Sequence, residues 1–221
     1  MNKKTKELFA AIDNNDFEKV VSLVSDKKVD VNAVDKYGYN PLMQAIECGA
    51  FNVVVYLVEN GAIVDDKCDN FSYNMLSLAS SVGNLDIVKY LISKGSSIED
   101  KYGVKALAMA AMNANLEIIK YLIESGVDIN EYDEYGSTPL RYAAFCGEID
   151  INETYAHDEK KGYTSEEDHL KIVKYLVEHG ADVNRKDYDG SLPLDGAVKY
   201  GYNNIAKYLI TMGTKIDNTK V

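Results

Sequence analysis

Three histidines are the side chains best suited to bind a metal or to transfer a proton near neutral pH. His157 and His169 lie beside carboxylates, but their spacing matches no known kind of metal site. His179 stands next to the glycine that closes a recurring phrase, where a capping or solvated role is favoured. The histidines therefore predict no metal, no cofactor and no catalytic base.

The three cysteines, Cys48, Cys68 and Cys146, are widely spaced and form no C-x-x-C pair. They indicate neither a disulfide framework nor a zinc site, and a reducing cytoplasm fits them best. Cys48 and Cys146 precede glycines at corresponding places in the chain, where we expect them to pack. The signatures of phosphate loops, nucleophile elbows and metalloprotease helices are absent from the sequence. The chain is therefore predicted not to be an enzyme.

Net charge narrows the class of partner. The 221 residues include 35 acidic and 24 basic side chains, for a formal net charge of −11. This charge argues against nucleic acid or an anionic membrane as the partner and favours a basic protein surface. No stretch approaches the ~20 apolar residues of a membrane helix, and the apolar run from Leu8 to Ile12 is too short for a secretory signal. A cytoplasmic, monomeric protein is expected.

One apolar phrase returns along the chain and ends each time at a glycine. Its clearest copies are LDIVKYLISKGS at 85–96 and LEIIKYLIESGV at 116–127. Branched residues stand at helical spacing within it, and the glycine suits a left-handed C-cap. Each phrase therefore predicts a helix with a defined end. The closing glycines are Gly61, Gly95, Gly126, Gly180 and Gly213, so that three of their four separations lie near 33 residues.

A shorter block, richer in alanine, precedes each phrase and predicts a second helix. Proline begins three of these blocks, at a place where a first helical turn needs no N–H: Pro41, Pro139 and Pro193. Alanine recurs at one position, which lets neighbouring helices approach closely: Ala45, Ala79, Ala110, Ala143 and Ala197. A polar link with an aspartate at a fixed place predicts a tight turn before each block: Asp35, Asp69, Asp100, Asp133 and Asp187.

The phrases DEYGSTPL at 133–140 and GADVN at 180–184 resemble the ankyrin repeat, and the resemblance covers essentially the whole chain. It implies an all-α repeat solenoid with six turn–helix–helix repeats in a single domain, residues 1–221. It also implies binding of a partner protein through the turns and first helices. We expect the repeats at about 4–34, 35–68, 69–99, 100–132, 133–186 and 187–217.

The fifth repeat carries 21 additional residues, 149–169, between its two helices. They include seven acidic residues and two lysines, with almost no apolar content. The segment is either a solvated excursion, which loops tolerate at small entropic cost, or an element specific to the partner. The first reading is favoured. Thr164, Ser165 and Glu166 also resemble a capped helix start, which would let the second helix begin early.

The turns and first helices of such a solenoid line one concave surface, and here these positions are rich in tyrosine. Tyrosine offers a large contact area, a polar tip and few rotors to freeze, as interfaces favour. The alternative is that the rings only pack on neighbouring turns. The expected partner-binding residues are Tyr37, Tyr39, Phe71, Tyr73, Tyr102, Tyr132, Tyr135 and Tyr188 on the turns, with Glu47, Met112, Asn113, Phe145 and Tyr200 late in the first helices.

A second set of tyrosines occupies one position within the recurring phrase, and we expect it to pack between stacked helices. These residues are Tyr56, Tyr90, Tyr121, Tyr175 and Tyr208. Acidic residues border the first set in the second half of the chain, so the partner surface that they meet is expected to be basic: Glu131, Asp133, Glu134, Asp187 and Asp189.

Three functions remain open from the sequence. A protein-interaction module is favoured. A dedicated acidic inhibitor, such as an immunity protein that neutralises a basic toxin or nuclease, is the first alternative. The second is an enzyme, or an enzyme's regulatory subunit, which would need a pocket with perturbed ionisable groups in the insertion.

Overall fold

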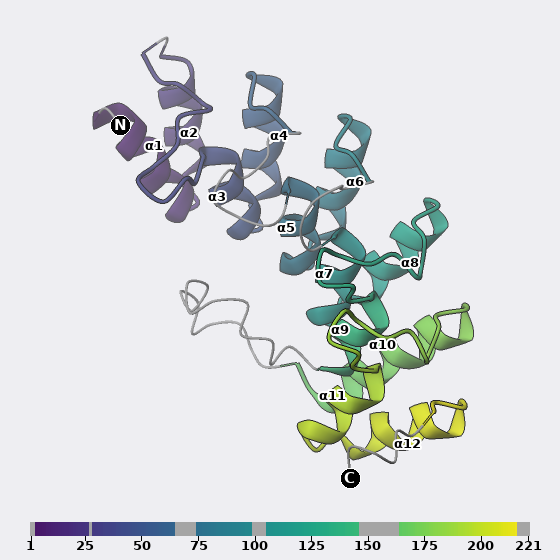
Figure 1. The fold of residues 1–221 in the computed structure, drawn as a ribbon. Coiled ribbons are helices and arrows are strands. Elements are labelled where there is room, and N and C mark those ends of the chain that lie inside the picture. The colour runs from purple at the N-terminus through teal and green to yellow at the C-terminus, as the bar shows by residue number, and fades with distance from the viewer. Residues whose placement is uncertain (1–2, 27, 65–73, 99–104, 146–163, 216–221) are drawn as a thin grey trace. The chain divides into compact units, whose positions relative to one another are not determined.

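The computed structural model describes residues 3–26, 28–64, 74–98, 105–145 and 164–215. These residues form twelve α-helices and no strand (Figure 1). Two parts of the chain are each compact: an N-terminal half, Met1–Ala106, and a C-terminal half, Leu107–Val221. The all-helical architecture predicted from the sequence is confirmed for the described residues.

The N-terminal half consists of helix pairs stacked in two layers. Its helices are α1 (Lys3–Asp13), α2 (Phe17–Val24), α3 (Pro41–Glu47), α4 (Phe51–Glu59), α5 (Met75–Val82) and α6 (Leu85–Ser93). The first helix of each pair contacts the first helix of the next, α1 with α3 and α3 with α5. The second helices α2, α4 and α6 pack in the same order. The apolar core lies between the two layers.

The C-terminal half repeats this arrangement. Its helices are α7 (Ala106–Met112), α8 (Leu116–Glu124), α9 (Pro139–Ala144), α10 (Glu166–Glu178), α11 (Pro193–Lys199) and α12 (Asn203–Thr211). Helix α9 packs on α10 and on α11, and α12 packs on α10 and on α11. In the short turn between α7 and α8, the backbone N–H of Asn115 donates to the carbonyl of Ala110 at 2.9 Å.

Local sequence signals account for the helix ends and for the close packing. Proline occupies the first turn of α3, α9 and α11, as predicted. The glycines that close the second helices all have φ between +90° and +100°, a conformation that side-chain-bearing residues rarely adopt. The alanines of the first helices are fully buried, which allows close helix contacts: Ala45, Ala79, Ala110, Ala143 and Ala197.

Asparagine side chains join successive polar links, a connection that the repeat pattern alone does not predict. The side-chain amide of Asn130 donates to the carbonyl of Gly180 at 3.0 Å, and its oxygen accepts from the N–H of Asp182 at 2.8 Å. Asn32 bonds Gly61 and Ile63 in the same way. Asn184 does so with Gly213 and Lys215. Each of these asparagines therefore ties its own link to the next one within its half of the chain.

The second helix of the fifth repeat begins early, as the sequence indicated. Ser165 caps α10 by accepting a hydrogen bond from the N–H of Asp168 at 3.2 Å. The residues from Glu166 to His169 therefore belong to the helix, so the excursion that was expected to extend to residue 169 ends before α10. The rest of the expected insertion, through residue 163, lies outside the described residues.

The first turn of α10 is anchored on both sides. His169 is fully buried, with Nδ1 at 3.1 Å from the carbonyl of Ala143 and Nε2 at 2.7 Å from the hydroxyl of Thr164. Glu166 accepts from the backbone N–H of Asn204 at 2.7 Å and of Ile205 at 3.3 Å. It therefore caps α12, whose own N-cap residue makes no side-chain cap bond. The start of α10 is part of the packed fold.

The longest of the described helices, α10, has 13 residues. No helix in the described part of the chain combines the length and the apolar character needed to cross a bilayer.

Candidate partner-binding surface

Two successive turns in the C-terminal half are built alike and joined to each other. Residues 133–138 precede α9, and residues 187–192 precede α11. The carboxylate of Asp133 accepts from the N–H groups of Tyr135 and Ser137, both at 2.9 Å. The carboxylate of Asp187 accepts from the N–H of Ser191 at 2.7 Å. The N–H of Tyr188 donates to the carbonyl of Tyr135 at 3.1 Å, so the two turns form one hydrogen-bonded unit.

Three tyrosine rings lie exposed on this pair of turns or directly before it, and we call them the tyrosine platform: Tyr132, Tyr135 and Tyr188. Their exposed fractions are 45%, 57% and 71%. The rings of Tyr132 and Tyr188 meet edge to face, with centroids 6.5 Å apart. Gly136 has φ +75°, and a Cβ at this position would lie 2.8 Å from the Tyr188 ring. The platform is therefore exposed while its backbone is held in place.

Two side chains of helix α9 contact the aspartates of the two turns. The guanidinium of Arg141 pairs with the carboxylate of Asp187 at 2.6 Å, and both side chains are largely buried. The hydroxyl of Tyr142 donates to the other oxygen of the Asp133 carboxylate. Burial, followed by this hydrogen bond, raises the pKa of Tyr142, so the hydroxyl remains a proton donor. Each turn aspartate thus bonds both to its own turn and to a side chain of α9.

Phe145, another expected binding residue, fills a gap that a glycine leaves. The Arg141 guanidinium lies 4.3 Å from the Phe145 ring centroid, and the Tyr200 ring lies 5.7 Å from it. A Cβ on Gly196 would come within 2.2 Å of the Phe145 ring. Phe145 and Tyr200 are half-buried, so both pack and present an edge. The sequence already marks Gly196 as unusual, because larger residues occupy its position in the other first helices: Gln44, Leu78, Met109 and Tyr142.

The N-terminal half brings three expected binding residues close together. The carboxylate of Asp35 accepts from the N–H groups of Tyr37 at 2.7 Å and Tyr39 at 2.9 Å. Tyr37 is 61% exposed, and the ammonium of Lys36 lies 4.5 Å from its ring centroid. The hydroxyl of Tyr39 donates to the carboxylate of Glu47 at 2.7 Å. This turn presents one exposed ring together with its own lysine.

The structure does not place the remaining expected residues as the sequence suggested. Met112 is only 6% exposed because all seven residues of α7 are buried, so it belongs to the core and is not available to a partner. Asn113 is half-buried and donates to the carbonyl of Met109 at 2.9 Å. Cys48, which was expected to pack, is exposed because it lies just beyond α3. Three further expected residues lie outside the described residues: Phe71, Tyr73 and Tyr102.

The tyrosines of the second helices are half-buried. The Tyr56 ring meets the Phe17 ring edge to face at 5.7 Å, and the Tyr90 ring meets the Phe51 ring at 5.9 Å. Each contact joins a second helix to the second helix of the preceding pair. The packing expected for this set is confirmed for Tyr56 and Tyr90.

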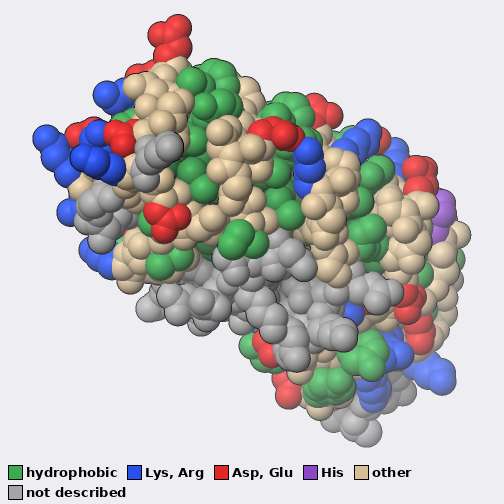
Figure 2. Space-filling view, turned by 90° about the horizontal axis from the view of Figure 1, so that it is seen from above, with side chains coloured by type: hydrophobic (Ala, Val, Ile, Leu, Met, Phe, Trp, Pro, Cys, Tyr) green, Lys and Arg blue, Asp and Glu red, His purple; other side chains and the backbone are tan. Residues whose placement is uncertain are grey.

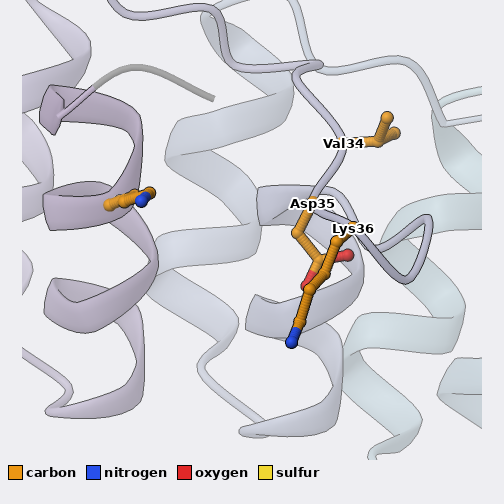
Figure 3. A pocket seen from close by; sticks show the side chains of 4 residues that line it. Val34, Asp35 and Lys36 are labelled. Carbon is orange, nitrogen blue, oxygen red and sulfur yellow. The ribbon is translucent and has the colours of Figure 1, made fainter.

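A hollow of about 610 Å³ lies beside the first polar link and is lined by Lys6, Val34, Asp35 and Lys36. In Figure 3, Val34 points away from the side on which Asp35 and Lys36 extend. Contact with Tyr37, a hydrogen bond first, raises the pKa of Lys36, which therefore remains protonated. Asp35 is already engaged by backbone N–H groups. The hollow therefore provides no base, and within the described ranges no group of histidine, cysteine and carboxylate side chains could hold a metal.

Acidic charge is unevenly distributed along the chain. Residues 107–221 contain 20 acidic and 12 basic side chains, whereas residues 1–106 contain 15 and 12. On the face shown in Figure 2, acidic side chains stand singly or in small groups among hydrophobic and basic ones. The excess of negative charge thus belongs mainly to the half that carries the tyrosine platform.

Stacked helix pairs joined by aspartate turns define an all-helical repeat protein with an exposed turn surface. The family model for ankyrin repeats, in three copies, matches residues 8–102, 76–159 and 162–220. The chain belongs to the ankyrin repeat family, whose domains are protein-binding modules and typically non-catalytic.

Curated relatives match parts of the chain. Protein phosphatase 1 regulatory subunit 27 of Homo sapiens is 46% identical over 50 residues, which are 23% of this chain and 32% of that protein. The Mus musculus counterpart is 46% identical over 48 residues, covering 22% and 31%. The chain thus spans about a third of the length of these two relatives. The putative ankyrin repeat protein FPV223 of Fowlpox virus is 30% identical over 93 residues, covering 38% and 66%.

Two solved structures are similar over nearly the whole chain. The human ASB11 ankyrin repeat domain has a TM-score of 0.76 and 21% identity, covering 96% of this chain and 85% of that one. A chain in the complex of the predatory endopeptidase Bd0816 of Bdellovibrio bacteriovorus with immunity protein Bd3460 has a TM-score of 0.70 and 25% identity. That match covers 92% and 96%. The first likeness, at 21% identity, shows the fold alone.

Proposed function

We propose that the protein binds another protein through its turns and first helices, with the tyrosine platform of the C-terminal half at the centre of the contact. The observation that carries this proposal is the exposure of Tyr132, Tyr135 and Tyr188 on two turns whose backbones are fixed by hydrogen bonds. Exposed aromatic rings on a rigid frame bind with little loss of conformational freedom. Tyrosine is also enriched in the centres of protein interfaces.

Residues beyond the platform extend the proposed surface. Phe145 and Tyr200 carry it along the first helices of the C-terminal half. The N-terminal half, taken by itself, has corresponding candidate binding residues in Tyr37, Tyr39 and Glu47. Affinity is expected to depend on a few well-packed rings near the centre, with the remaining contacts excluding water.

Affinity capture from a lysate of the source organism tests this proposal. Native protein is compared with a variant carrying Tyr135→Ala and Tyr188→Ala, and captured proteins are quantified by mass spectrometry. Loss of two central rings is expected to reduce recovery of specific partners by tenfold or more, since each such truncation costs about 1–2 kcal/mol or more. A thermal unfolding curve for each variant verifies that the fold is retained.

A matched control removes two exposed apolar side chains that lie away from the turns. Ile210 and Met212 lie on and just beyond the second helix α12 and are 45% and 43% exposed. The Ile210→Ala, Met212→Ala variant should recover the same partners as the native chain. If the two double variants behaved alike, the assignment of binding to the turns would be wrong.

A second function is favoured by one comparison. The structural similarity to a chain from an endopeptidase–immunity protein complex, together with the net charge of −11, supports an inhibitor that neutralises a basic enzyme. Acidic surfaces accelerate association with basic partners, and this effect weakens as salt rises.

Inhibition can be tested with the partner recovered by capture. An inhibitor should abolish the partner's hydrolytic activity at a one-to-one ratio, and its association rate should fall steeply with added salt. A captured partner that has no hydrolytic activity, or that stays fully active when saturated with this protein, would exclude the inhibitor reading. Either result would leave the binding proposal in place.

A further inference from the structure

The tyrosine platform presents aromatic faces whose only cation contact among the described residues is made by an arginine. The guanidinium of Arg185 lies 4.8 Å from the Tyr132 ring centroid. No basic side chain of the described residues is placed over the rings of Tyr135 or Tyr188. These two rings are also the most exposed of the platform, at 57% and 71%. Tyr135 and Tyr188 are therefore exposed rings still open to a cation, whereas Tyr132 already holds a guanidinium.

Arginine stacking recurs within the same half of the chain. The Arg141 guanidinium lies 4.3 Å from the Phe145 ring centroid while its Nη2 pairs with Asp187 at 2.6 Å. One guanidinium thus uses its flat face against a ring and its edge against a carboxylate. Lys94 also contacts a ring and a carboxylate, those of Tyr90 and Glu59, but its compact ammonium has no planar face that can stack on the ring as a guanidinium does.

Exposed carboxylates accompany the two open rings. Glu134 directly precedes Tyr135, and Asp189 directly follows Tyr188. Both acidic residues are exposed, and they belong to the half of the chain that carries 20 acidic and 12 basic side chains. Each of the two rings thus has an exposed carboxylate next to it in the sequence, and Arg141 shows within the fold that one guanidinium can contact a ring and a carboxylate together.

We propose that the tyrosine platform binds an arginine-bearing basic segment of the partner, with a guanidinium on the ring of Tyr135 or Tyr188 and its edge toward Glu134 or Asp189. This inference rests on the proposed function and specifies the partner's chemistry. Charge complementarity selects a basic segment over an acidic one. The aromatic faces select arginine over lysine.

Short capped peptides test the inference directly. One alternates arginine with glycine, the second alternates lysine with glycine, and the third alternates glutamate with glycine. Binding to the full chain is followed by titration, with tyrosine ring resonances recorded by NMR. The arginine peptide is expected to bind roughly three- to tenfold more tightly than the lysine peptide, with the glutamate peptide weakest. Equal affinity for the arginine and lysine peptides would overturn the proposal.

Three variants localise the site. Tyr188→Leu keeps apolar bulk over Gly136 while it removes the π face, and should remove most of the preference for arginine. Glu134→Gln with Asp189→Asn should weaken binding of both basic peptides and flatten its salt dependence. Ile210→Ala with Met212→Ala, on and just beyond α12, should bind the basic peptides like the native chain. Retention of the arginine preference in Tyr188→Leu combined with Tyr135→Leu would place the peptide elsewhere and refute the site.

The partner-capture experiment separates this inference from the proposed function. If capture depends on Tyr135 and Tyr188 but the peptides show no preference for arginine, only the chemistry of the partner is wrong. If capture is indifferent to both residues, the binding surface itself is wrong.

Discussion

The turn before α3 and the two turns of the C-terminal half have the same backbone hydrogen bonding but expose different side chains. In each, an aspartate accepts hydrogen bonds from N–H groups of its own turn: Asp35, Asp133 and Asp187. The turn before α3 exposes Tyr37, which Lys36 already contacts. The C-terminal turns are bonded to each other and expose the two open rings of Tyr135 and Tyr188. The repeat therefore determines the backbone of the turn, whereas individual substitutions on it determine what the turn can bind.

The largest expected difference between these turns lies in the buried ion pair. Asp187→Ala should leave Arg141 buried without its carboxylate and cost about 3–5 kcal/mol in the free energy of unfolding. Asp35→Ala removes only backbone hydrogen bonds and should cost about 1–2 kcal/mol. Urea denaturation of both variants measures the difference. Equal losses would show that the ion pair adds nothing to the turn.

A second difference concerns the close approach at Gly136. Gly136→Ala combines a positive φ with a Cβ 2.8 Å from the Tyr188 ring, so it should cost about 2–3 kcal/mol and shift that ring. Gly190 is the matched control, because it has φ +78° with open space around its Cβ position. Gly190→Ala should cost about 1 kcal/mol. Thermal unfolding and the Tyr188 ring resonances distinguish the two, and similar effects would mean that the turns are not packed together.

The cap that α10 supplies to α12 is a smaller contribution, confined to the C-terminal half. Glu166→Ala should cost about 1 kcal/mol, because the first N–H groups of α12 lose their acceptor and its dipole loses a nearby negative charge. Hydrogen exchange at Asn204 and Ile205 should accelerate. Glu167→Ala, in the same helical turn but exposed, should leave that exchange unchanged. Exchange unaltered by Glu166→Ala would refute the cap.

The smallest expected effect is a pH dependence from His169. Burial lowers the pKa of His169 below its ordinary value, although its hydrogen bond to the Ala143 carbonyl opposes this. The folded protein therefore keeps this ring neutral where the unfolded chain takes up a proton. The contribution of His169 to the free energy of unfolding is complete above about pH 6.5. It is lost as the pH falls toward the pKa of His169 in the folded protein. The melting temperature should fall more between pH 7.5 and 5.5 for the native chain than for His169→Gln, and parallel curves would contradict this.

The features that follow from local sequence could be predicted. Glycine caps, prolines in first turns, buried alanines and aspartate turns each depend on a few neighbouring residues, and all agree with the structure wherever it describes them. The early start of α10 was visible from Ser165 and the acidic residues after it. Local backbone chemistry therefore accounts for most of the fold.

Contacts between distant residues could not be predicted in the same way. The pairs Arg141 with Asp187 and Glu166 with Asn204 join residues 46 and 38 positions apart. Nothing in the repeat pattern requires either pair. Met112 was mistaken for a surface residue because the pattern places it late in a first helix, whereas every residue of α7 is buried. A single domain of six repeats, the role of the insertion and a cytoplasmic location stay predictions.

Site-specific crosslinking in the cells that make the protein tests the central claim most directly. A photoreactive phenylalanine analogue replaces Tyr188 on the platform, Tyr37 on the N-terminal turn or Tyr208 on α12, one at a time. The account predicts the strongest partner crosslink from position 188, less from 37 and none from 208. A partner crosslinked only from position 208 would place recognition on the second helices and contradict the account.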